Sequence, residues 1–405
     1  SYKQEDGVIY NARDMAVLRA SIEMATVILA SATPSLESWV NAKNGKYNHV
    51  QIHERYGEAT LPNLSAIDLR KENLKSDEWI SNRLEKSTTE CLQSGDQTLL
   101  FLNRRGYSPT TVCRVCGNQI SCDQCDARMV EHRFINRLMC HQCGHTKPMP
   151  NKCPSCGIIG KLAVVGPGVE RLAEEAQIKF PKAKISVLSS DLYGSAKSLK
   201  NEIQKISEGN TDIIIGTQLV AKGHNFPKLR LVGVIDIDIG LHGSDLRAAE
   251  RTYQLVRQVS GRAGRTDNKG RALIQTYQPE HPVVEAILKG NDDEFWVSEA
   301  KQRELACMPP FGKLVGIIIS SSDFERAMSA ANQLKNNTQA LDIIRARAYG
   351  PAPAPIARIK RRHRIRFLVK SPRTPGLQDA VRKWVTSVSL KGDLRLSIDI
   401  DPQSF

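Results

Sequence analysis

The chain has 405 residues, 40% of them hydrophobic, and carries a formal net charge of +14 with a pI of about 9.3. This length fits roughly two to four domains. No apolar run approaches the length that spans a bilayer, so we expect no helical span and no membrane partner. The positive charge favours a polyanionic partner, although charge alone is also compatible with a basic protein that binds none.

Eight of the ten cysteines lie in one stretch, as four C-x-x-C pairs: CRVC (113–116), CDQC (122–125), CHQC (140–143) and CPSC (153–156). One such turn presents two thiolates to a metal ion, and two turns complete a tetrahedral zinc site. We therefore predict two structural Zn²⁺ ions rather than disulfides or redox thiols. Metal-bound thiolates would lower the net charge to roughly +10.

The spacing of the pairs predicts which of them share an ion. Five residues separate the first pair from the second, whereas fourteen separate the second from the third, which is close to the usual zinc-ribbon gap. This favours a nested arrangement, with one ion held by Cys122, Cys125, Cys140 and Cys143 and the other by Cys113, Cys116, Cys153 and Cys156. His141 and His145 are expected near the sites but not as ligands, and the isolated Cys91 and Cys307 are expected to be inert.

The chain before the cysteines alternates helix and strand. A loop and a helix are expected over 1–28, followed by an apolar strand over 27–35 that ends in Ser31-Ala32-Thr33. Ser35 is the expected N-cap of the next helix. Small hydroxyl residues at the end of a strand suit ligand contacts in open α/β sheets, a structural turn being the alternative. A polar passage (about 53–78), a helix (79–93) and a buried parallel strand within 98–107 follow.

After the cysteines the pattern continues as strand, glycine turn and helix over 162–180, strand 185–188, helix 195–208 stopped by Gly209, and two buried strands within 211–238. The loop between these last two strands carries hydroxyl, amide and cationic groups that suit phosphate oxygens. They are Thr217, Gln218, Lys222 and His224.

A helix is expected over 243–265, with Ser244 as its N-cap and a final run Gly261-Arg262-Ala263-Gly264-Arg265. Two arginines between glycines can both point forward, which fits arginine fingers on a γ-phosphate. A solvated basic turn is the alternative.

Beyond residue 280 the pattern predicts a connector helix (282–305), a strand within 307–323, a helix (324–340), a hairpin (350–370), a helix (375–388) and a strand (394–400), hence a small α+β domain. Six cations crowd the hairpin: Arg358, Lys360, Arg361, Arg362, Arg364 and Arg366. Asp342 is the one acidic residue between Ala340 and Asp379, so we expect all six cations to face solvent and a polyanion. The alternative is a solubilising surface.

Three short motifs, SAT (31–33), GTQLVAKGHNFP (216–227) and QVSGRAGR (258–265), resemble the coupling, DNA-contact and ATP-contact motifs of superfamily-2 helicases. With the eight cysteines, MPPFG (308–312), GPAPAPIARI (350–359) and DPQSF (401–405), the chain resembles the bacterial primosomal protein N′ family, the PriA-type replication-restart helicases. The resemblance covers essentially the whole chain.

This resemblance implies an α/β fold: a RecA-like P-loop helicase lobe with a parallel sheet, an inserted two-zinc domain and a small α+β C-terminal domain. The implied domains are the end of lobe 1 with a linker (1–68), lobe 2 in two parts (69–110 and 162–281), the two-zinc insertion (111–161), and the connector helix with a DNA- and partner-binding domain (282–405).

The resemblance also implies roles. Thr217 and Gln218 would contact the tracking DNA strand. Nucleotide contacts would come from Gln258, Arg262 and Arg265, and coupling of hydrolysis to strand movement from Ser31 and Thr33. The implied cofactors are ATP with Mg²⁺. The implied partners are branched and single-stranded DNA, the tail of a single-strand-binding protein and other primosome proteins, for a monomeric, cytoplasmic, nucleoid-associated protein. Asn225 and Val169 depart from the family pattern.

The sequence contains neither a G-x-x-x-x-G-K-[ST] phosphate loop nor an Asp-Glu-x-His magnesium motif. The resemblance places both upstream of Ser1, so we expect no ATP hydrolysis by this chain alone. For the intact protein we expect an ATP-dependent 3′→5′ DNA helicase that recognises stalled or branched forks and initiates primosome assembly. The alternative is a non-catalytic, zinc-dependent adaptor that binds branched DNA.

Overall fold

A computed structural model describes the chain apart from a set of short segments. These are residues 1–2, 5–8, 53–61, 76–77, 104–109, 114–115, 117, 119, 125–128, 133–136, 141–144, 161, 166–167, 190–191, 194, 222–224, 242–245, 265–269 and 404–405. Among the helices that are described, none combines the length and the apolar character that a membrane span requires.

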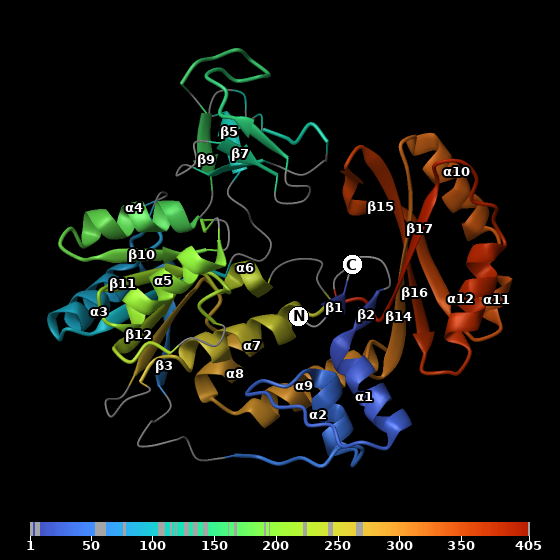
Figure 1. The fold of residues 1–405 in the computed structure, drawn as a ribbon, viewed down its shortest axis with the longest axis horizontal. Helices are drawn as coiled ribbons and strands as arrows, with labels where there is room; N and C mark the ends of the chain where they lie inside the picture. Colours follow the sequence, from blue (N-terminus) through green and yellow to red (C-terminus); the bar gives the residue numbers. More distant parts are fainter. Residues whose placement is uncertain are drawn as a thin grey trace.

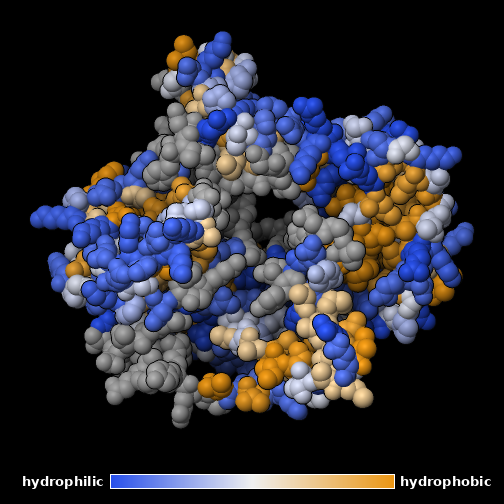
Figure 2. All heavy atoms as spheres, viewed as in Figure 1, coloured by the Kyte–Doolittle hydropathy of each residue, from blue (hydrophilic) through white to orange (hydrophobic). Residues whose placement is uncertain are grey.

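The N-terminal part consists of β1 (Lys3–Gln4), β2 (Tyr10–Asn11), α1 (Ala12–Glu23) and α2 (Leu36–Lys43). Ser35 caps α2 as expected, since its side chain accepts a hydrogen bond from the backbone of Ser38. The predicted strand over 27–35 is wrong: the segment pairs with no described strand, and Ile28 is 84% exposed. Figure 2 shows hydrophobic side chains at the surface in the lower part of the view, where Figure 1 places α1 and α2. An apolar run becomes a strand only where a sheet edge satisfies its backbone.

The centre is a six-stranded parallel sheet in the order β10-β11-β4-β12-β13-β3 (Figure 1). Its strands are β3 (Asn63–Asp68), β4 (Gln97–Phe101), β10 (Ile185–Leu188), β11 (Ile213–Gly216), β12 (Leu229–Val234) and β13 (Arg271–Thr276). Strand β3 lies inside the stretch that we expected to be an irregular polar passage. As an edge strand it needs fewer apolar residues than the central ones.

Helices cover both faces of this sheet. One face packs α3 (Asn82–Gln93) and α4 (Val169–Lys179), and the other packs α5 (Ala196–Ser207), α7 (Ala248–Ser260), α8 (Pro282–Lys289), α9 (Asp292–Leu305) and α2. Strand β4 and the residue after it show why: Leu99 and Phe101 enter one core, whereas Leu100 and Leu102 enter the other. The short α6 (Asp238–Leu241) precedes α7, which begins later than expected, and the proposed cap Ser244 lies outside the described residues.

The cysteine-rich region is inserted between β4 and α4. It contains an antiparallel pair, β5 (Thr110–Cys113) with β9 (Leu162–Val165), and a three-stranded sheet of β6 (Val130–His132), β7 (Arg137–Met139) and β8 (Thr146–Pro148). The expected strand at 162–165 therefore exists, but it pairs with β5 instead of joining the parallel sheet. The pairing closes the base of the insertion where the chain leaves and returns.

The C-terminal domain is a four-stranded antiparallel sheet in the order β15-β16-β14-β17. Its elements are β14 (Gly312–Ser321), α10 (Phe324–Lys335), α11 (Gln339–Asp342), β15 (Arg347–Ile359), β16 (Arg362–Pro372), α12 (Leu377–Thr386) and β17 (Arg395–Ile400). The helices cover one face, on the side away from the parallel sheet (Figure 1). Ile365, Phe367 and Val369 of β16 point to these helices, and the half-buried residues between them point to the opposite face, where none of the described helices packs.

One buried side chain ties the entry of α3 to the parallel sheet. The amide of Gln275, on β13, donates to the carbonyls of Trp79 at 2.6 Å and Ile235 at 2.7 Å, and its oxygen accepts from the backbone of Ser81 at 2.9 Å. Gln275 has no exposed surface. Three backbone groups therefore depend on one amide.

We predict that Gln275→Met lowers the free energy of unfolding by about 3 kcal/mol or more, because each buried polar group left without a partner costs about 1–3 kcal/mol. Urea unfolding followed by tryptophan fluorescence measures the change. Gln93→Met, at an exposed position in the last turn of α3, is the matched control and should leave the midpoint unchanged. Equal midpoints for both variants would contradict the role of Gln275.

Candidate metal centre and nucleotide site

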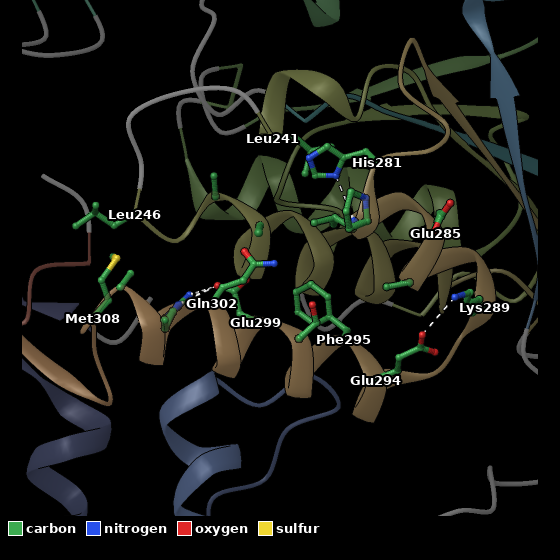
Figure 3. Close-up of a pocket in the computed structure, with 18 residues that line it drawn as sticks. Leu241, Leu246, His281, Glu285, Lys289, Glu294, Phe295, Glu299, Gln302 and Met308 are labelled. Atoms are coloured by element: carbon green, nitrogen blue, oxygen red, sulfur yellow. Dashed lines mark hydrogen bonds and ion pairs between the residues drawn. The ribbon is translucent and has the colours of Figure 1, made fainter.

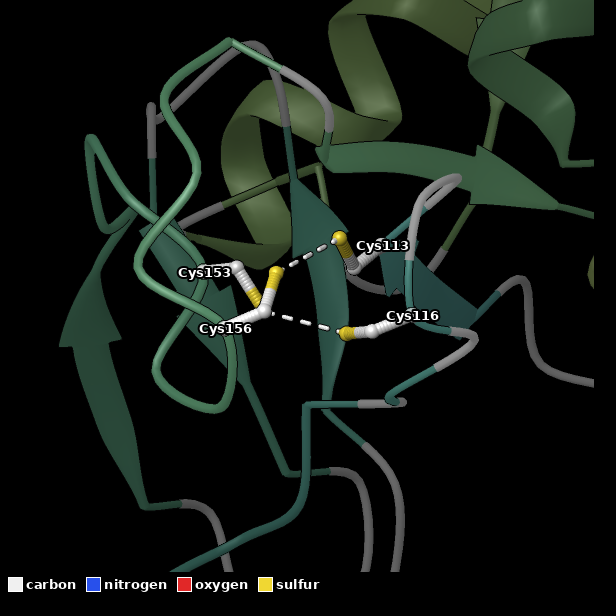
Figure 4. Close-up of side chains that lie close together, drawn as sticks. All are labelled: Cys113, Cys116, Cys153 and Cys156. Atoms are coloured by element: carbon white, nitrogen blue, oxygen red, sulfur yellow. Dashed lines mark hydrogen bonds between the residues drawn. The ribbon is translucent and has the colours of Figure 1, made fainter.

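Four of the eight clustered cysteines meet in space. The sulfur atoms of Cys113, Cys116, Cys153 and Cys156 all lie within 4.8 Å of one another (Figure 4). The sulfurs of Cys113 and Cys156 lie 3.7 Å apart, and those of Cys116 and Cys153 lie 3.6 Å apart. Tetrahedral zinc with Zn–S bonds of about 2.3 Å places its sulfurs about 3.8 Å apart, so this donor set fits zinc.

Three of the four cysteine turns share one backbone hydrogen bond. The N–H groups of Cys113, Cys140 and Cys153 each donate to the carbonyl five residues later, at 2.8 Å in every case. In two pairs the turn also directs an N–H at the first sulfur, from Gln124 to Cys122 and from Ser155 to Cys153, both at 3.4 Å. Such bonds favour the thiolate. A hydrogen bond from the backbone of Cys156 is the main cause that lowers the pKa of Cys153 to about 6.

The second predicted ligand set is described only in part. Cys122 and Cys140 are both buried in one small core, while Cys125 and Cys143 lie outside the described residues, as does His141. The turns that carry the two described cysteines are neighbours, since Gln124 lies 3.4 Å from Nδ1 of His145. The other ring nitrogen of His145 lies 3.4 Å from Asp123. These contacts place His145 beside the cysteine turns.

Three segments singled out in the sequence converge beside α7. Nε2 of Gln258 donates to Oγ1 of Thr33 at 2.7 Å, and Oγ of Ser31 accepts from the backbone of Thr33 at 3.1 Å. One turn earlier on the helix, Gln254 donates to the carbonyl of Pro34 at 2.8 Å. The hydroxyl segment and the glutamine face of α7 are therefore joined directly, and both Ser31 and Gln258 remain exposed to solvent.

The third segment is the loop after β11. Arg262, just beyond the end of α7, donates to the carbonyl of Ala221 at 2.5 Å. Thr217 is buried at the start of this loop, and Gln218 beside it is half-buried. Lys222, His224 and Arg265 lie outside the described residues. Hydroxyl, amide and guanidinium groups thus gather around one side of the parallel-sheet domain, a composition that suits phosphate oxygens.

The prediction that all six hairpin cations face solvent is wrong for two of them. Arg362 donates to the carbonyls of Ser320 and Asp393 and lies 3.5 Å from the Asp393 carboxylate. Arg364 donates to the carbonyl of Ile356 at 3.2 Å, and burial lowers its pKa. The partner Asp393 comes from the loop before β17, outside the stretch in which we counted acidic residues. Lys360 and Arg361, at the tip, are exposed.

The hairpin tip contacts the cysteine-rich region. The backbone N–H of Arg361 donates to the carbonyl of Gln124 at 2.8 Å, and Ile359 packs against the small core that contains Cys122 and Cys140. The basic tip of the C-terminal domain is therefore held against the CDQC turn.

A cavity of about 530 Å³ lies between α7, α8 and α9 (Figure 3). Apolar residues such as Phe295 and Met308 line it, together with polar residues including His281, Glu299 and Gln302. It shares no residue with the three converging segments, so we assign it no ligand.

Family models match three parts of the chain. Residues 157–267 match the helicase conserved C-terminal domain, which makes the parallel-sheet domain a helicase domain. Residues 122–148 match the PriA DNA helicase Cys-rich region, and residues 304–403 match the primosomal protein N C-terminal domain. The chain belongs to the PriA family of replication restart proteins, and its cysteine-rich region is of the zinc-binding kind.

Curated relatives agree with this assignment. The replication restart protein PriA of Rickettsia felis is 38% identical over 100% of this chain and 62% of its own length. The PriA proteins of Haemophilus influenzae and Bacillus subtilis are 35% and 34% identical, over 55% and 50% of their own lengths. The chain thus spans between about half and three fifths of these relatives.

Solved structures with a similar arrangement include Dbp5 of S. cerevisiae bound to RNA and ADP BeF3, which is 14% identical over 72% of this chain and 54% of that chain, with a TM-score of 0.36. RecG bound to a three-way DNA junction is 12% identical over 67% of this chain and 26% of that chain, with a TM-score of 0.38. Likenesses this weak carry no argument about function.

The motifs did not identify every residue of the converging segments. Gln254 lies four residues before Gln258, so helical spacing places both on one face of α7, and this was the available signal. No local pattern indicates that Arg361 meets Gln124, because the two residues are more than two hundred positions apart.

For the cysteines we predict that Cys113→Ser and Cys156→Ser, singly or together, remove one zinc ion per chain. Cys113→Ser combined with Cys122→Ser should remove two, because each four-thiolate site needs all its ligands. Metal content of the purified variants measures this, with Cys91→Ser and Cys307→Ser as controls outside the cluster. Loss of a single ion from the Cys113/Cys122 double variant would contradict the nested assignment.

Proposed function

We propose that the intact protein is an ATP-dependent 3′→5′ DNA helicase of replication restart, and that this chain supplies the second part of its motor. The observation that carries the proposal is the junction of Thr33, Gln258 and the Arg262–Ala221 contact, which joins the three motif segments. Arg262 and Arg265 stabilise charge on the transferred phosphoryl group. Gln258 contacts nucleotide and links it to Ser31 and Thr33. In this proposal the phosphate loop and the Mg²⁺ ligands lie outside these 405 residues.

We propose two structural zinc ions in the nested arrangement. The quartet with four described sulfurs supports one of them, and the neighbouring Cys122 and Cys140 turns support the other. Zinc would hold the turns of the insertion together, and the thiolates themselves take no part in nucleotide turnover.

The proposed DNA contacts fall on two surfaces. Thr217, Gln218, Lys222 and His224 contact the tracking strand. The C-terminal domain adds Arg358, Lys360, Arg361 and Arg366, for branched as well as single-stranded DNA. Because Ile365, Phe367 and Val369 of β16 face the helices, Arg366 and Lys370 lie on the opposite face of the sheet. There Lys370 is the cross-strand neighbour of Arg347. The acidic tail of a single-strand-binding protein would suit the same cations.

In the intact protein, Arg262→Ala should lower kcat for DNA-stimulated ATP hydrolysis by a factor on the order of 10³, as the loss of an arginine finger does. Gln258→Ala should lower it less, because the glutamine supplies a neutral contact. A coupled phosphate-release assay measures both, and Arg382→Ala, on an exposed face of α12, is the control. Branched-DNA binding without any ATP turnover in the parent protein would support the adaptor function instead.

A salt titration of DNA binding should distinguish the exposed cations of the hairpin tip from Arg362, which is bound within the domain. Lys360→Ala and Arg361→Ala should each reduce the slope of log affinity against log salt by roughly one, because each removes a phosphate contact. Arg362→Ala should leave that slope nearly unchanged and lower the melting temperature, since its guanidinium binds within the domain. Equal effects of Arg361→Ala and Arg362→Ala on the slope would contradict this division.

A further inference from the structure

The first turns of α7 hold a buried ion network, formed by Glu37, Arg247, Glu250, Glu299 and Arg303. Glu250 is 3% exposed, and its two oxygens accept from the backbone of Leu36 at 3.1 Å and from Arg303 at 2.7 Å. Arg303 also donates to Glu299 at 2.8 Å. Arg247 lies 2.5 Å from Glu37. One end of α7 is therefore joined to α2 and α9 by charged groups that are shielded from water.

The C-terminal tail contacts the same end of α7. Arg251 donates to the carbonyl of Gln403 at 2.5 Å. Two residues earlier, Asp401 forms two hydrogen bonds with Leu314 at the start of β14: its carboxylate accepts at 3.0 Å and its N–H donates at 2.8 Å. Residues 401–403 thus link the C-terminal sheet to α7 directly, by hydrogen bonds that do not involve the connector helices.

The other end of α7 lies at the proposed nucleotide site. The helix has 13 residues, so it is about 20 Å long at 1.5 Å per residue. Gln254 and Gln258 bind residues 33–34 near its last turn. Between the two ends, Tyr253, Val256 and Val259 are fully buried in the core. A helix packed this closely shifts as a unit, so a displacement at its first turn reaches its last.

We infer that Arg251 is a positioning residue that couples the C-terminal domain to the nucleotide site through α7. A ligand on the C-terminal domain that moves residues 401–403 changes the position of Gln258 and thereby the affinity for nucleotide. Nucleotide bound at Gln258 then changes the affinity of the C-terminal domain for that ligand by the same factor. The coupling involves nucleotide turnover and therefore rests on the proposed function. The mechanical link from Arg251 to Gln258 does not depend on that function.

Two measurements test the coupling. In the intact protein, Arg251→Ala should reduce the stimulation of ATP turnover by forked DNA by roughly 2- to 30-fold, the range found for residues along coupling networks. Turnover without DNA and the Kd for forked DNA should stay within about twofold of the parent. Arg251→Lys, which keeps an N–H donor for Gln403, should restore most of the stimulation. A chain that ends after Pro402 should reproduce Arg251→Ala, and the two changes combined should be no worse than either alone.

The second measurement needs no activity. In this 405-residue chain, Arg251→Ala should speed amide hydrogen exchange at residues 254–260, and Arg382→Ala should not. Unchanged exchange there, or additive effects of Arg251→Ala and the truncation, would overturn the inference. Absence of ATP turnover in the parent protein would refute the proposed function alone, and hydrogen exchange would then decide the link from Arg251 to Gln258.

Discussion

The arrangement of the parts depends on a single buried carboxylate. Glu250 gives one oxygen to the amino end of α2 and the other to Arg303 of α9, so three segments distant in sequence meet at one side chain. A buried ion pair adds little net stability over apolar packing, because both charges lose their water. Removal of one partner, however, leaves an unpaired buried charge and costs about 3–5 kcal/mol. Glu250 therefore determines how α2, α7 and α9 are arranged more than it adds to the stability of the fold.

The same environment acts on the neighbouring Glu37. Burial alone would raise the pKa of this carboxyl, but Arg247 and then Arg13 more than offset that effect, and the pKa falls to about 2. Because the folded-state pKa lies below the ordinary value, the stabilisation from Glu37 is present at neutral pH and is lost only as the pH falls towards about 2. The charges that join α2 to α7 are therefore constant over the physiological range.

Hydrophobic pattern was sufficient for the central strands and for most helices, because β4, β11 and β12 are buried on both faces and read as continuous apolar runs. It failed where the outcome depends on a distant neighbour. The run at 27–31 has the composition of a strand but pairs with none that is described, and the polar β3 is a strand because β13 offers it an edge. Likewise Arg362 is paired by Asp393, which no count within the hairpin includes. Cysteine spacing predicted the quartet of Cys113, Cys116, Cys153 and Cys156, because each C-x-x-C turn is a local feature of the sequence.

The hairpin tip shows how such a distant contact shapes a local element. Ile359 pairs with Arg362, so Lys360 and Arg361 form a two-residue turn, and both have positive φ, at 49° and 62°. Turns of this kind favour asparagine and glycine, and a residue with a Cβ held there costs about 1 kcal/mol or more. Two bulky cations persist at this turn because the surroundings stabilise it: Gln124 accepts from the backbone of Arg361, and Ile359 is packed in the core around Cys122 and Cys140. The cysteine-rich region therefore helps to hold the two cations of the tip, Lys360 and Arg361, in place. The predicted metal ligands and the proposed DNA contacts, which lie in separate parts of the sequence, come together at this turn.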